Sequence, residues 1–452
     1  MRIYFSLFII LLTIIFSFAV HASPKNIGIV FSGEELGNID PCGCYDGQIG
    51  GLPRRYSFID SLRKQKNIIL PVSLGDLPRS FGRQDEIKTE IFCRALGEMD
   101  YVLHNLGEKD IELGLQSISY LSQTSKVVFL SSNIEISPAF PVKICKYVLK
   151  DCNDVEYPLK IAFLGILSQA LVNSNTLDCV HVYEPVEALK ILIKEVQHKA
   201  DLIILLSHAS LSESIKIAKS FPEIGLIITG HNIDEPKDAV IYVKNTPIVS
   251  SGTDGRFLGC IKYSINKNRV IKRTSVEILP LDNRYKDSEE MVSLLKEYQQ
   301  MLIDEDLLSR IQQTPLAEEL SYVGSPTCGM CHKMIYDHWL KTAHASAYYT
   351  LVKAGHQYDP ECIKCHTIGY GFVSGFLNFE KDRNLINVGC ESCHGAGSGH
   401  IKNVNSLYGE SGENNCKICH DHDHSPKFQY KDYWVKIIHP RETMKNLSEV
   451  TR

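Results

Sequence analysis

The last third of this 452-residue chain contains four copies of the pattern Cys-x-x-Cys-His, and no other feature of the sequence limits the fold as strongly. In c-type haem attachment, two thiols with this spacing bind the porphyrin covalently and the adjacent His ligates the iron. Zinc binding is the alternative, because Cys-x-x-Cys is also half of a zinc site. Zinc gives no reason, however, for a His after the second Cys in all four copies. The sequence therefore predicts four covalent c-type haems, at Cys328, Cys331 and His332; Cys362, Cys365 and His366; Cys390, Cys393 and His394; and Cys416, Cys419 and His420.

The second axial position of each iron must be filled by another side chain or stay open. Of the 17 His in the chain, 11 lie beyond residue 330. Methionine is the other common ligand, but Met330 and Met334 lie inside or beside the first motif, which leaves only Met444. We therefore expect bis-histidine ligation, which is typical of electron-transfer haems, although any single one of these His can equally be a surface residue. The His outside the motifs are His338, His344, His356, His400, His422, His424 and His439.

The segment that carries the four motifs has few strand patterns. Short helices joined by Gly-rich loops are expected there instead. Four haems in so short a segment leave little room for a conventional side-chain core, so we expect the porphyrins themselves to form most of it.

Several motifs in this segment resemble the tetrahaem cytochrome c-554 family. They are Cys328-Gly-Met-Cys331-His332; Trp339-Leu-Lys-Thr342-Ala-His344; Cys390-Glu-Ser-Cys393-His394 with His400 shortly after; and Cys416-Lys-Ile-Cys419-His420 followed by Tyr433-Trp-Val-Lys-Ile-Ile-His439-Pro440. The resemblance implies that His344, His400 and His439 are distal ligands and that one haem lacks a strong sixth ligand. His356 and the pair His422 and His424 have no counterpart in the family; either could fill the remaining position or lie at the surface.

From Asn26 to about Pro280 the chain shows a different pattern, in which short apolar runs alternate with amphipathic stretches. The apolar runs predict strands at Ile27–Phe31, Ile68–Ser73, Lys126–Leu130, Ile161–Leu164, Leu202–Leu206 and Leu226–Ile228. The amphipathic stretches predict helices that include Arg54–Lys64, Ile87–Glu98 and Val186–Lys199, and a connecting helix or two within Glu289–Gln312. This alternation predicts a layered α/β domain.

Motifs along residues 26–282 resemble the 5′-nucleotidase branch of the calcineurin-like phosphoesterases. The matching pieces are Gly37-Asn38, Gly50-Gly51-Leu52-Pro53-Arg54-Arg55, Gly75-Asp76-Leu77, Leu106-Gly107-Glu108-Lys109-Asp110, Ser207-His208 and Gly230-His231-Asn232-Ile233. The resemblance implies a four-layer α/β sandwich with two sheets between helices and two metal ions at the strand ends. The complete expected architecture is this sandwich followed by a mostly α-helical, haem-packed cytochrome domain.

Several metal ligands of that family are replaced in this chain. Glu34 and Leu36 stand at the D-x-H positions, Glu108 and Lys109 at the Asn and catalytic His of the G-N-H-E motif, and Ile233 at the second His of the G-H-x-H motif. Asp76, Glu108, His208 and His231 remain as candidate ligands for one divalent ion. The alternative is that they are inherited remnants satisfied by ordinary hydrogen bonds. Since a Lys is protonated at neutral pH, we expect little or no phosphoesterase activity.

The cysteines outside the haem motifs have no clear pairing. Cys42 and Cys44 follow the altered first motif, where they could bind a soft metal, take part in thiol redox chemistry or pair with distant cysteines. Cys145 and Cys152 could close a small loop. Seven cysteines precede the haem motifs, the others being Cys93, Cys179 and Cys260. An odd number leaves at least one thiol unpaired within this domain.

The N-terminus predicts export. Residues 1–22 combine one Arg, a long apolar run and the small-residue site Val20-His21-Ala22, as in a secretory signal peptide. The alternative is that this segment stays on the protein as an uncleaved membrane anchor. No later stretch of the chain is long and apolar enough to span a membrane. We therefore expect a periplasmic protein. The net charge of -5 excludes the basic face of a nucleic-acid binder.

These observations predict a signal peptide at 1–22, a phosphoesterase-like domain at 24–283, a helical linker at 284–320 and a tetrahaem cytochrome domain at 321–452. The leading hypothesis is a periplasmic electron carrier that exchanges electrons with redox partner proteins and uses the phosphoesterase-like domain for binding or docking. The alternatives are a small-molecule oxidoreductase, of the nitrogen oxide or hydroxylamine type, at a five-coordinate haem, and a residual metal-dependent phosphohydrolase or nucleotidase. The oligomeric state is left open.

Overall fold

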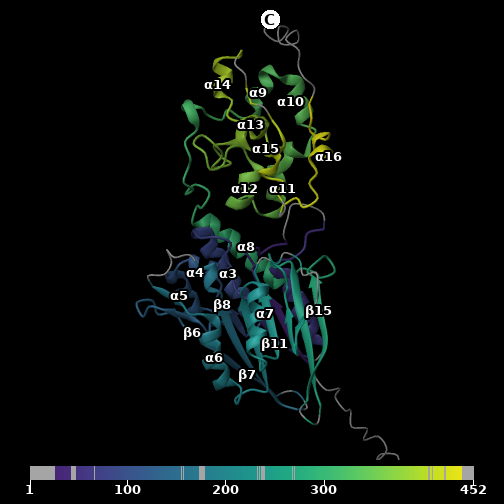
Figure 1. Cartoon of the computed structure of the whole chain (residues 1–452). Coiled ribbons are helices and arrows are strands. Elements are labelled where there is room, and N and C mark those ends of the chain that lie inside the picture. The colour runs from purple at the N-terminus through teal and green to yellow at the C-terminus, as the bar shows by residue number, and fades with distance from the viewer. Residues whose placement is uncertain are drawn as a thin grey trace, which may run out of the picture.

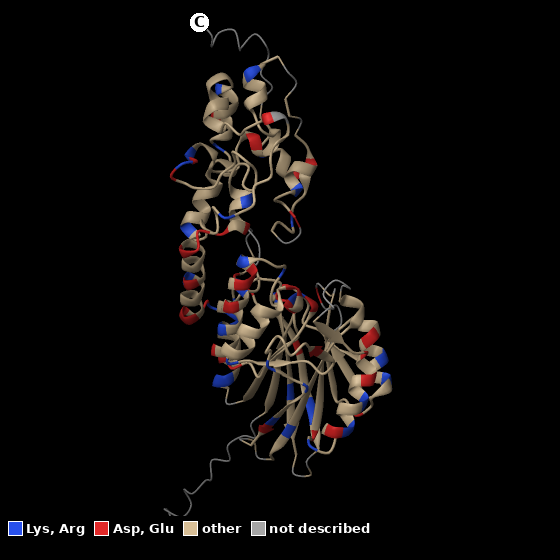
Figure 2. Ribbon diagram, turned by 90° about the vertical axis from the view of Figure 1, so that its left-hand side faces the viewer, with Lys and Arg blue, Asp and Glu red and all other residues tan. Residues whose placement is uncertain are grey.

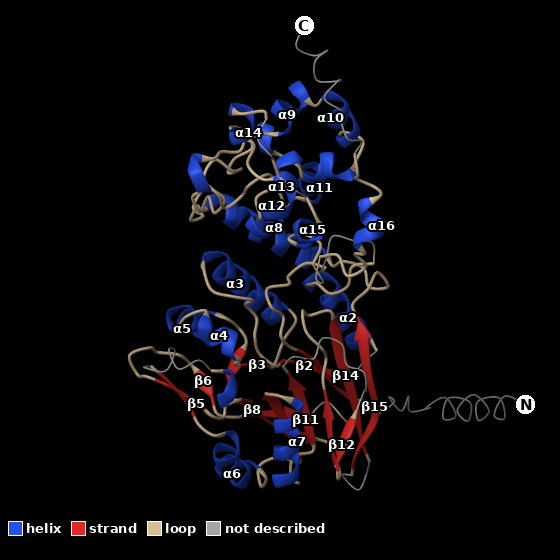
Figure 3. Ribbon diagram, turned by 45° about the horizontal axis from the view of Figure 1, so that its top comes forward, coloured by secondary structure: helices blue, strands red, loops and turns tan. Residues whose placement is uncertain are grey.

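The computed structural model describes residues 26–41, 47–65, 67–153, 155, 157–172, 179–231, 233, 235, 240–266, 268, 270–405, 408–409, 411–421 and 424–439. The expectations for the segment 1–22, for Cys42 and Cys44 and for His422 fall outside these residues. No helix among the described residues combines the length and the apolar character needed to cross a membrane. The strands lie in the N-terminal part of the chain and short helices make up the C-terminal part (Figure 3).

Two large mixed sheets form the N-terminal part (Figure 1). The first has the strand order β15 (Ile271–Pro280), β14 (Phe257–Ile265), β1 (Ile27–Ser32), β2 (Ile68–Ser73), β3 (Leu103–Asn105), β4 (Val128–Leu130) and β6 (Ile144–Cys145). The second has the order β12 (Ile241–Val243), β13 (Thr246–Val249), β11 (Leu226–Gly230), β10 (Leu202–His208), β8 (Leu159–Leu167) and β7 (Val148–Cys152). A separate pair joins β5 (Ile134–Ile136) to β9 (Val180–Val182). The predicted strands are all present.

Alternation of side chains along the strands explains why the two sheets stack. In β10, Leu202, Ile204 and Leu206 belong to a buried cluster shared with β1 and β2, whereas Ile203 and Leu205 pack toward helices. Since successive side chains of a strand point to opposite faces, a strand that is apolar at every position must be covered on both sides. The shared cluster is therefore the layer between the sheets, and the predicted four-layer α/β sandwich is confirmed.

Helices cover both outer faces of the sandwich. The first sheet packs against α2 (Leu52–Lys64), α3 (Arg83–Glu98), α5 (Leu115–Thr124) and α8 (Glu289–Asp304), with the short α4 (Glu108–Glu112) between them, and the second packs against α6 (Pro185–Val196) and α7 (Leu211–Ser220). The predicted helices are present. Within the expected linker, α8 buries Met291, Leu294, Tyr298 and Leu302 in the same cluster as α2 and α3. The linker helix is therefore part of the core of the sandwich.

The C-terminal part consists of short helices: α9 (Ser325–Cys331), α10 (Lys333–Trp339), α11 (Ala347–Ala354), α12 (Pro360–His366), α13 (Cys390–His394), α14 (Ser398–Lys402), α15 (Glu413–Lys417) and α16 (Tyr430–Trp434). Single 3₁₀ turns occur at Gln169–Leu171, Ala317–Glu319, Ala343–Ser346 and Arg383–Leu385. A small side-chain core does form in this part, around Tyr348, Ile363 and Phe376. Charges of both signs are interspersed over both parts of the chain (Figure 2).

A fully buried ion pair joins the segment after β1 to α2. The Arg55 guanidinium donates to both carboxylate oxygens of Glu35, with 2.8 Å between Nη1 and Oε1, and neither side chain is exposed to solvent. Arg55 also reaches the hydroxyl of Ser32, at 3.3 Å. Because a buried charge without a partner is strongly destabilising, this pair holds the segment that carries Glu34 in one position.

We predict that Arg55→Met lowers the free energy of unfolding of the sandwich by about 3–5 kcal/mol, because it leaves the Glu35 carboxylate buried without a partner. Urea unfolding followed by far-ultraviolet circular dichroism measures the change. Arg63→Met is the matched control, since Arg63 pairs with the exposed Asp100 at 3.3 Å; an exposed pair of this kind contributes at most about 1 kcal/mol. Equal effects of the two substitutions would contradict the structural role of the buried pair.

Candidate metal and haem sites

Five ionisable side chains meet where the strands of both sheets end at their carboxyl termini. Glu34 follows β1, Asp76 follows β2, Glu108 begins α4 after β3, His208 is the last residue of β10 and His231 follows β11. We call these five residues the carboxylate–imidazole site. Open α/β sheets bind ligands at this edge, because loops from neighbouring parallel strands converge there.

The donor atoms of this site lie close together. Those of Glu34, Asp76, His208 and His231 all lie within 4.8 Å of one another. His208 Nε2 lies 2.7 Å from Glu108 Oε2 and 3.3 Å from Asp76 Oδ2. His231 Nδ1 lies 3.1 Å from Glu34 Oε1 and 3.6 Å from Glu108 Oε1. The four residues expected as ligands are thus brought together.

Glu34 is the member of the site that sequence reasoning missed. It stands at the Asp of the D-x-H pair, but the loss of the His at Leu36 removes the pattern that would mark it as a ligand. The carboxylate nevertheless points to His231, because β1 and β11 lie in different sheets whose ends face each other. The sequence did contain a signal for Glu34, because Glu and Asp both offer carboxylate oxygens as metal ligands.

The backbone around the site is constrained. Glu34, Leu36 and Asp76 have positive φ values of 47°, 49° and 57°, which side-chain-bearing residues seldom adopt. A Cβ on Gly107 would lie 2.1 Å from Asp76 Oδ1, so only glycine fits there. Such strain persists only where surrounding contacts hold it, and it is concentrated at functional sites.

Asp110 holds one wall of the site by accepting three backbone hydrogen bonds. Its carboxylate accepts from the N–H groups of Gly107, Asp76 and Leu77 at 2.8, 2.9 and 3.1 Å. Its Oδ2 also lies 3.1 Å from His104 Nε2. Burial raises the pKa of Asp110, but His104 and these N–H groups outweigh it, so the net shift is downward. Asp110 is therefore a positioning residue for Asp76.

The imidazoles and carboxylates of the site share protons. Burial raises the pKa of Asp76 to about 6, although His208 opposes the shift. Burial opposes the charge on His208, but Asp76 and Glu108 raise its pKa well above the ordinary value. The pKa of His231 is raised by its hydrogen bond to Glu34. A cation at this site would therefore have to displace the proton of His208.

The chemistry of the donors fits a divalent ion. Glu34 Oε2 and His208 Nδ1 are buried without hydrogen-bond partners, and a buried polar atom without a partner is costly. Two imidazoles and three carboxylates suit a borderline or hard divalent cation, such as zinc, iron or manganese. The positions that lost their ligands offer no side-chain ligand. The Lys109 ammonium pairs with Glu112 at 2.8 Å, and its backbone N–H donates to Asp76 Oδ1 at 2.8 Å. The backbone N–H of Leu36 donates to the Asp76 carbonyl at 3.2 Å.

In the C-terminal part, three of the motif imidazoles face a second imidazole from a distant segment. The ring centres are 6.2 Å apart for His332 and His400, 6.3 Å for His420 and His344, and 6.1 Å for His394 and His439. Two imidazoles that ligate one iron from opposite sides have ring centres about 6 Å apart, because each metal–nitrogen bond is about 2 Å. The observed pairs fit haem, and they involve the three His predicted as distal ligands.

Three of the motif imidazoles are also held in position by a polar contact at Nδ1. His366 Nδ1 lies 2.7 Å from the Ala347 carbonyl oxygen, and His394 Nδ1 lies 2.8 Å from the Gly409 carbonyl oxygen. His420 Nδ1 lies 3.1 Å from Ser425 Oγ. A ligating His usually donates its second ring N–H in this way, which fixes the tautomer and leaves the other nitrogen for the metal.

His366 differs from the other three motif imidazoles. Among the described residues no imidazole ring is paired with it in this facing arrangement. Its neighbour His424 places Nδ1 2.7 Å from Asp421 Oδ1, and His356 Nδ1 lies 3.1 Å from Gln299 Nε2. Both contacts use Nδ1 and leave Nε2 of each ring for a metal, as in the motif imidazoles, and His424 is the imidazole that lies near His366.

The four motifs form a row in space that differs from their order in the chain. Cys328 of the first motif contacts Cys390 of the third, Cys393 of the third lies near Cys416 of the fourth, and Cys365 of the second contacts Cys419 of the fourth. The spatial order is thus first, third, fourth and second. The second motif, on α12, lies at the end that packs against the sandwich (Figure 1).

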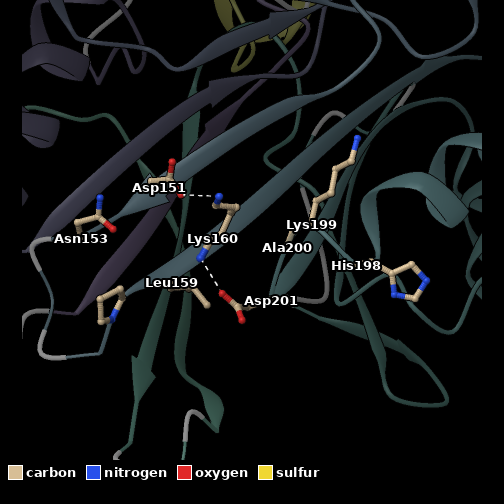
Figure 4. Close-up of a pocket in the computed structure, with 9 residues that line it drawn as sticks. Asp151, Asn153, Leu159, Lys160, His198, Lys199, Ala200 and Asp201 are labelled. Atoms are coloured by element: carbon tan, nitrogen blue, oxygen red, sulfur yellow. Dashed lines mark hydrogen bonds and ion pairs between the residues drawn. The ribbon is translucent and has the colours of Figure 1, made fainter.

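A surface pocket lies away from both kinds of site. It has a volume of ≈ 270 Å³ and is lined by residues at the start of β8 and just before β10 (Figure 4). These strand starts lie at the end of the second sheet opposite the carboxylate–imidazole site. Lys160 Nζ pairs there with Asp151 at 3.2 Å, and the Lys160 backbone N–H donates to Asp201 at 2.9 Å. None of the predicted site residues lines it.

The small loop that Cys145 and Cys152 could close is not closed by a disulfide. The exposed Cys145 carries a free thiol and forms no disulfide with the buried Cys152.

Comparisons with known proteins match the two parts separately. The family model described as "Cytochrome c554 and c-prime" matches residues 327–395. The chain is 34% identical over 97 residues to cytochrome c-554 of Nitrosomonas europaea, covering 18% of this chain and 41% of that protein. It is 25% identical over 306 residues to a 5'-nucleotidase of Diplobatis ommata, covering 60% of this chain and 51% of that protein.

A solved structure agrees with the observed fold. The 5'-nucleotidase precursor from Thermus thermophilus superposes with a TM-score of 0.54 at 15% identity, covering 73% of this chain and 68% of that one. At this identity the likeness concerns the fold alone. The chain spans about two fifths and one half of the lengths of the two curated relatives.

We predict that the full chain binds zinc at the carboxylate–imidazole site and that its affinity increases between pH 5 and pH 7. The cation requires an ionised Asp76, whose pKa is about 6, and it must also displace the proton of His208. Equilibrium dialysis with elemental analysis measures the bound zinc. Asp76→Asn should weaken binding at least about tenfold, since even outer partners of metal ligands contribute 10–100-fold. Asp100→Asn, at an exposed carboxylate, is the control; equal affinities for the two variants would count against the site.

Proposed function

We propose that this chain, which carries a cytochrome c554 domain at residues 327–395 and the 5'-nucleotidase and calcineurin-like phosphoesterase fold over most of its length, is an exported, periplasmic electron-transfer protein with four covalent c-type haems. The phosphoesterase-like domain binds one divalent cation and serves binding or docking. Redox proteins of the periplasm are its partners.

The observation that carries the proposal is the set of three imidazole pairs with ring centres 6.1–6.3 Å apart. Each pair joins a Cys-x-x-Cys-His motif to a His from a distant segment, and this spacing suits an iron held from both sides. Haem supplies one-electron redox chemistry when bound. An iron with two imidazole ligands has no free position for a substrate, which favours electron transfer over catalysis at these three positions.

The row of motifs supports transfer along the domain. Neighbouring motifs contact each other through Cys328 and Cys390, and through Cys365 and Cys419. The residues of the chain hold the rings rigidly, for example through the hydrogen bonds of His366 and His394 to backbone carbonyls. Rigid ligands change little between oxidation states, which suits an electron carrier.

The altered residues of the phosphoesterase-like domain argue against hydrolysis. Lys109 stands where the family has its catalytic His, and its ammonium pairs with Glu112 at 2.8 Å. Leu36 and Ile233 remove two imidazoles that a second metal would need. A dinuclear site clamps the attacking and leaving oxygens together, and one cation with a protonated Lys cannot replace that arrangement.

A second candidate function concerns the haem of the second motif. His366 is held by Ala347 and has no facing imidazole among the described residues, and the resemblance to the cytochrome c-554 family implies one haem without a strong sixth ligand. An iron with an open position would bind a small nitrogen or oxygen species. Ferric electron paramagnetic resonance distinguishes the cases, since an open iron contributes a high-spin signal of about one haem in four.

We predict that His344→Ala raises the high-spin fraction by about one haem in four relative to the wild-type chain, because it removes the ring that faces His420. Electron paramagnetic resonance of the ferric protein measures this fraction, and pyridine haemochrome analysis of the same sample should still count four haems. His338→Ala is the matched control, since His338 faces no motif imidazole within the described part of the chain. An unchanged spectrum of His344→Ala would contradict the ligand assignment.

We predict no hydrolysis of nitrophenyl phosphate or of nucleotides by the holoprotein with added zinc, manganese or magnesium, because the catalytic His is absent. Spectrophotometric assays of released nitrophenol and phosphate check this expectation. Turnover that disappears in Asp76→Ala would instead establish a phosphohydrolase and overturn this part of the proposal.

A further inference from the structure

The helix that carries the second haem motif is seated on the phosphoesterase-like domain by one carboxylate. Asp359 caps α12 by accepting from the Glu361 N–H at 2.9 Å. The same carboxylate accepts from Gln84 Nε2 of α3 at 2.8 Å and from the Tyr298 hydroxyl of α8 at 3.0 Å. Asp359 is 5% exposed and Tyr298 is 1% exposed. The haem-bearing helix is therefore joined to two helices of the sandwich by buried hydrogen bonds.

An ion pair between a buried lysine and a glutamate that is 43% exposed strengthens this junction. Lys88 of α3 places Nζ 2.5 Å from Glu361 Oε2, and its side chain is only 6% exposed. Burial opposes the charge on Lys88, but Glu361 and Asp359 raise its pKa above the ordinary value. Lys88 also lies near the buried Asp359, so removing it takes a compensating positive charge away from that carboxylate. Replacing Lys88 would therefore weaken the contact between α3 and α12.

Two of the five segments that bear residues of the carboxylate–imidazole site lead to this junction. Asp76 is followed by a short loop and then α3, with Gln84 and Lys88 in its first two turns. Glu34 begins the segment 33–41, in which Asp40 places Oδ2 3.7 Å from His356 Nε2. The side-chain donor atoms of His356, Asp359 and Cys362 lie within 4.8 Å of one another. Cys362 is one of the two thiols that would attach the second haem.

Arg79 connects the two segments. Its Nε donates to the Leu36 carbonyl oxygen at 3.0 Å, and its Nη2 lies 3.0 Å from Asp254 Oδ1. The backbone N–H of Asp254 in turn donates to the Glu34 carbonyl oxygen at 2.7 Å. A displacement of Glu34 would therefore be transmitted to the loop that leads into α3.

Cation binding would change the partner of Glu34. In the observed state the Glu34 and Glu108 carboxylates face the imidazoles of His231 and His208 at 3.1 and 2.7 Å. A cation held between these donors would take the place of the direct carboxylate–imidazole contacts, so Glu34 would pair with the cation in place of His231. The positive φ values of Glu34 and Leu36 show that this segment is held under strain. The segment has a reason to change conformation when its ion pairs are broken.

We propose that the carboxylate–imidazole site and the haem attached through Cys362 and Cys365 are coupled through α3 and the segment 33–41. Binding of a divalent cation at the first site changes the reduction potential of that haem, and the oxidation state of the haem changes the cation affinity by the same factor. The inference rests on the proposed function, because it requires both a cation and a haem. It gives the phosphoesterase-like domain the role of a cation-dependent regulator of electron transfer.

The test is spectroelectrochemical titration of the full-length holoprotein with and without zinc, which is redox-inert. Couplings between sites are typically at least about fivefold in affinity, and for a one-electron couple a tenfold change corresponds to 59 mV. One of the four haem waves should therefore shift by about 40 mV or more. Zinc bound to the same samples is measured by equilibrium dialysis.

Two variants test the route. Lys88→Met removes the ion pair to Glu361. Tyr298→Phe removes a single hydroxyl, which donates to Asp359 and accepts from Gln84, so this variant remains informative if the first one folds poorly. Both should bind zinc as the wild-type chain does, yet lose at least half of the shift. The matched control is Lys126→Met, because Lys126 pairs with Glu98 at the other end of α3, where both side chains are exposed. This control should keep the full shift.

Each remaining outcome overturns a defined statement. If the wild-type chain binds no zinc, both the proposed cation site and the coupling are wrong. If zinc binds and all four waves stay in place, the site stands and the coupling is wrong. A shift of full size in both Lys88→Met and Tyr298→Phe would overturn the route through α3 and α12.

Discussion

Buried carboxylates place the strictest demand on this structure, because each of them needs a cation or hydrogen-bond donors in place of water. Glu35 finds Arg55, Asp110 finds three backbone N–H groups, and Asp359 finds Gln84 and Tyr298. These contacts determine how the loop after β1, the loop after β2 and the helix α12 are held. The positions of both candidate cofactor sites therefore depend on how buried negative charge is compensated.

Only in the carboxylate–imidazole site is this compensation incomplete, among the buried carboxylates that the structure describes. Three carboxylates share two imidazoles there, and Glu34 Oε2 and His208 Nδ1 have no partners. Elsewhere in the described sandwich, Arg55 shows that the fold can fully neutralise a buried Glu. The contrast favours a cation as the missing partner of the site, in keeping with the edge of the sheets at which it lies.

Much of the site was predictable because its chemistry is local in sequence. Cys-x-x-Cys-His places three haem-binding groups within five residues, and Asp76, His208 and His231 each lie next to a strand end that hydrophobic patterning revealed. Glu34 was missed because its partner His231 is almost two hundred residues away and in another sheet. The role of Asp359 was also hidden, since an acidic residue before a Pro looks like an ordinary helix cap.

The sequence by itself determined the layered α/β part, the haem-attaching part and the identity of most candidate ligands, because strand alternation and covalent motifs are properties of short segments. Only the tertiary structure decided which imidazole faces which motif. His400 pairs with His332, His344 with His420, and His439 with His394, and none of these pairings follows the order of the chain. It also decided that the second motif, rather than the first, meets the sandwich. The physical reason is that a short segment specifies its own conformation, whereas contacts between distant segments arise only when all buried apolar and charged groups are satisfied together.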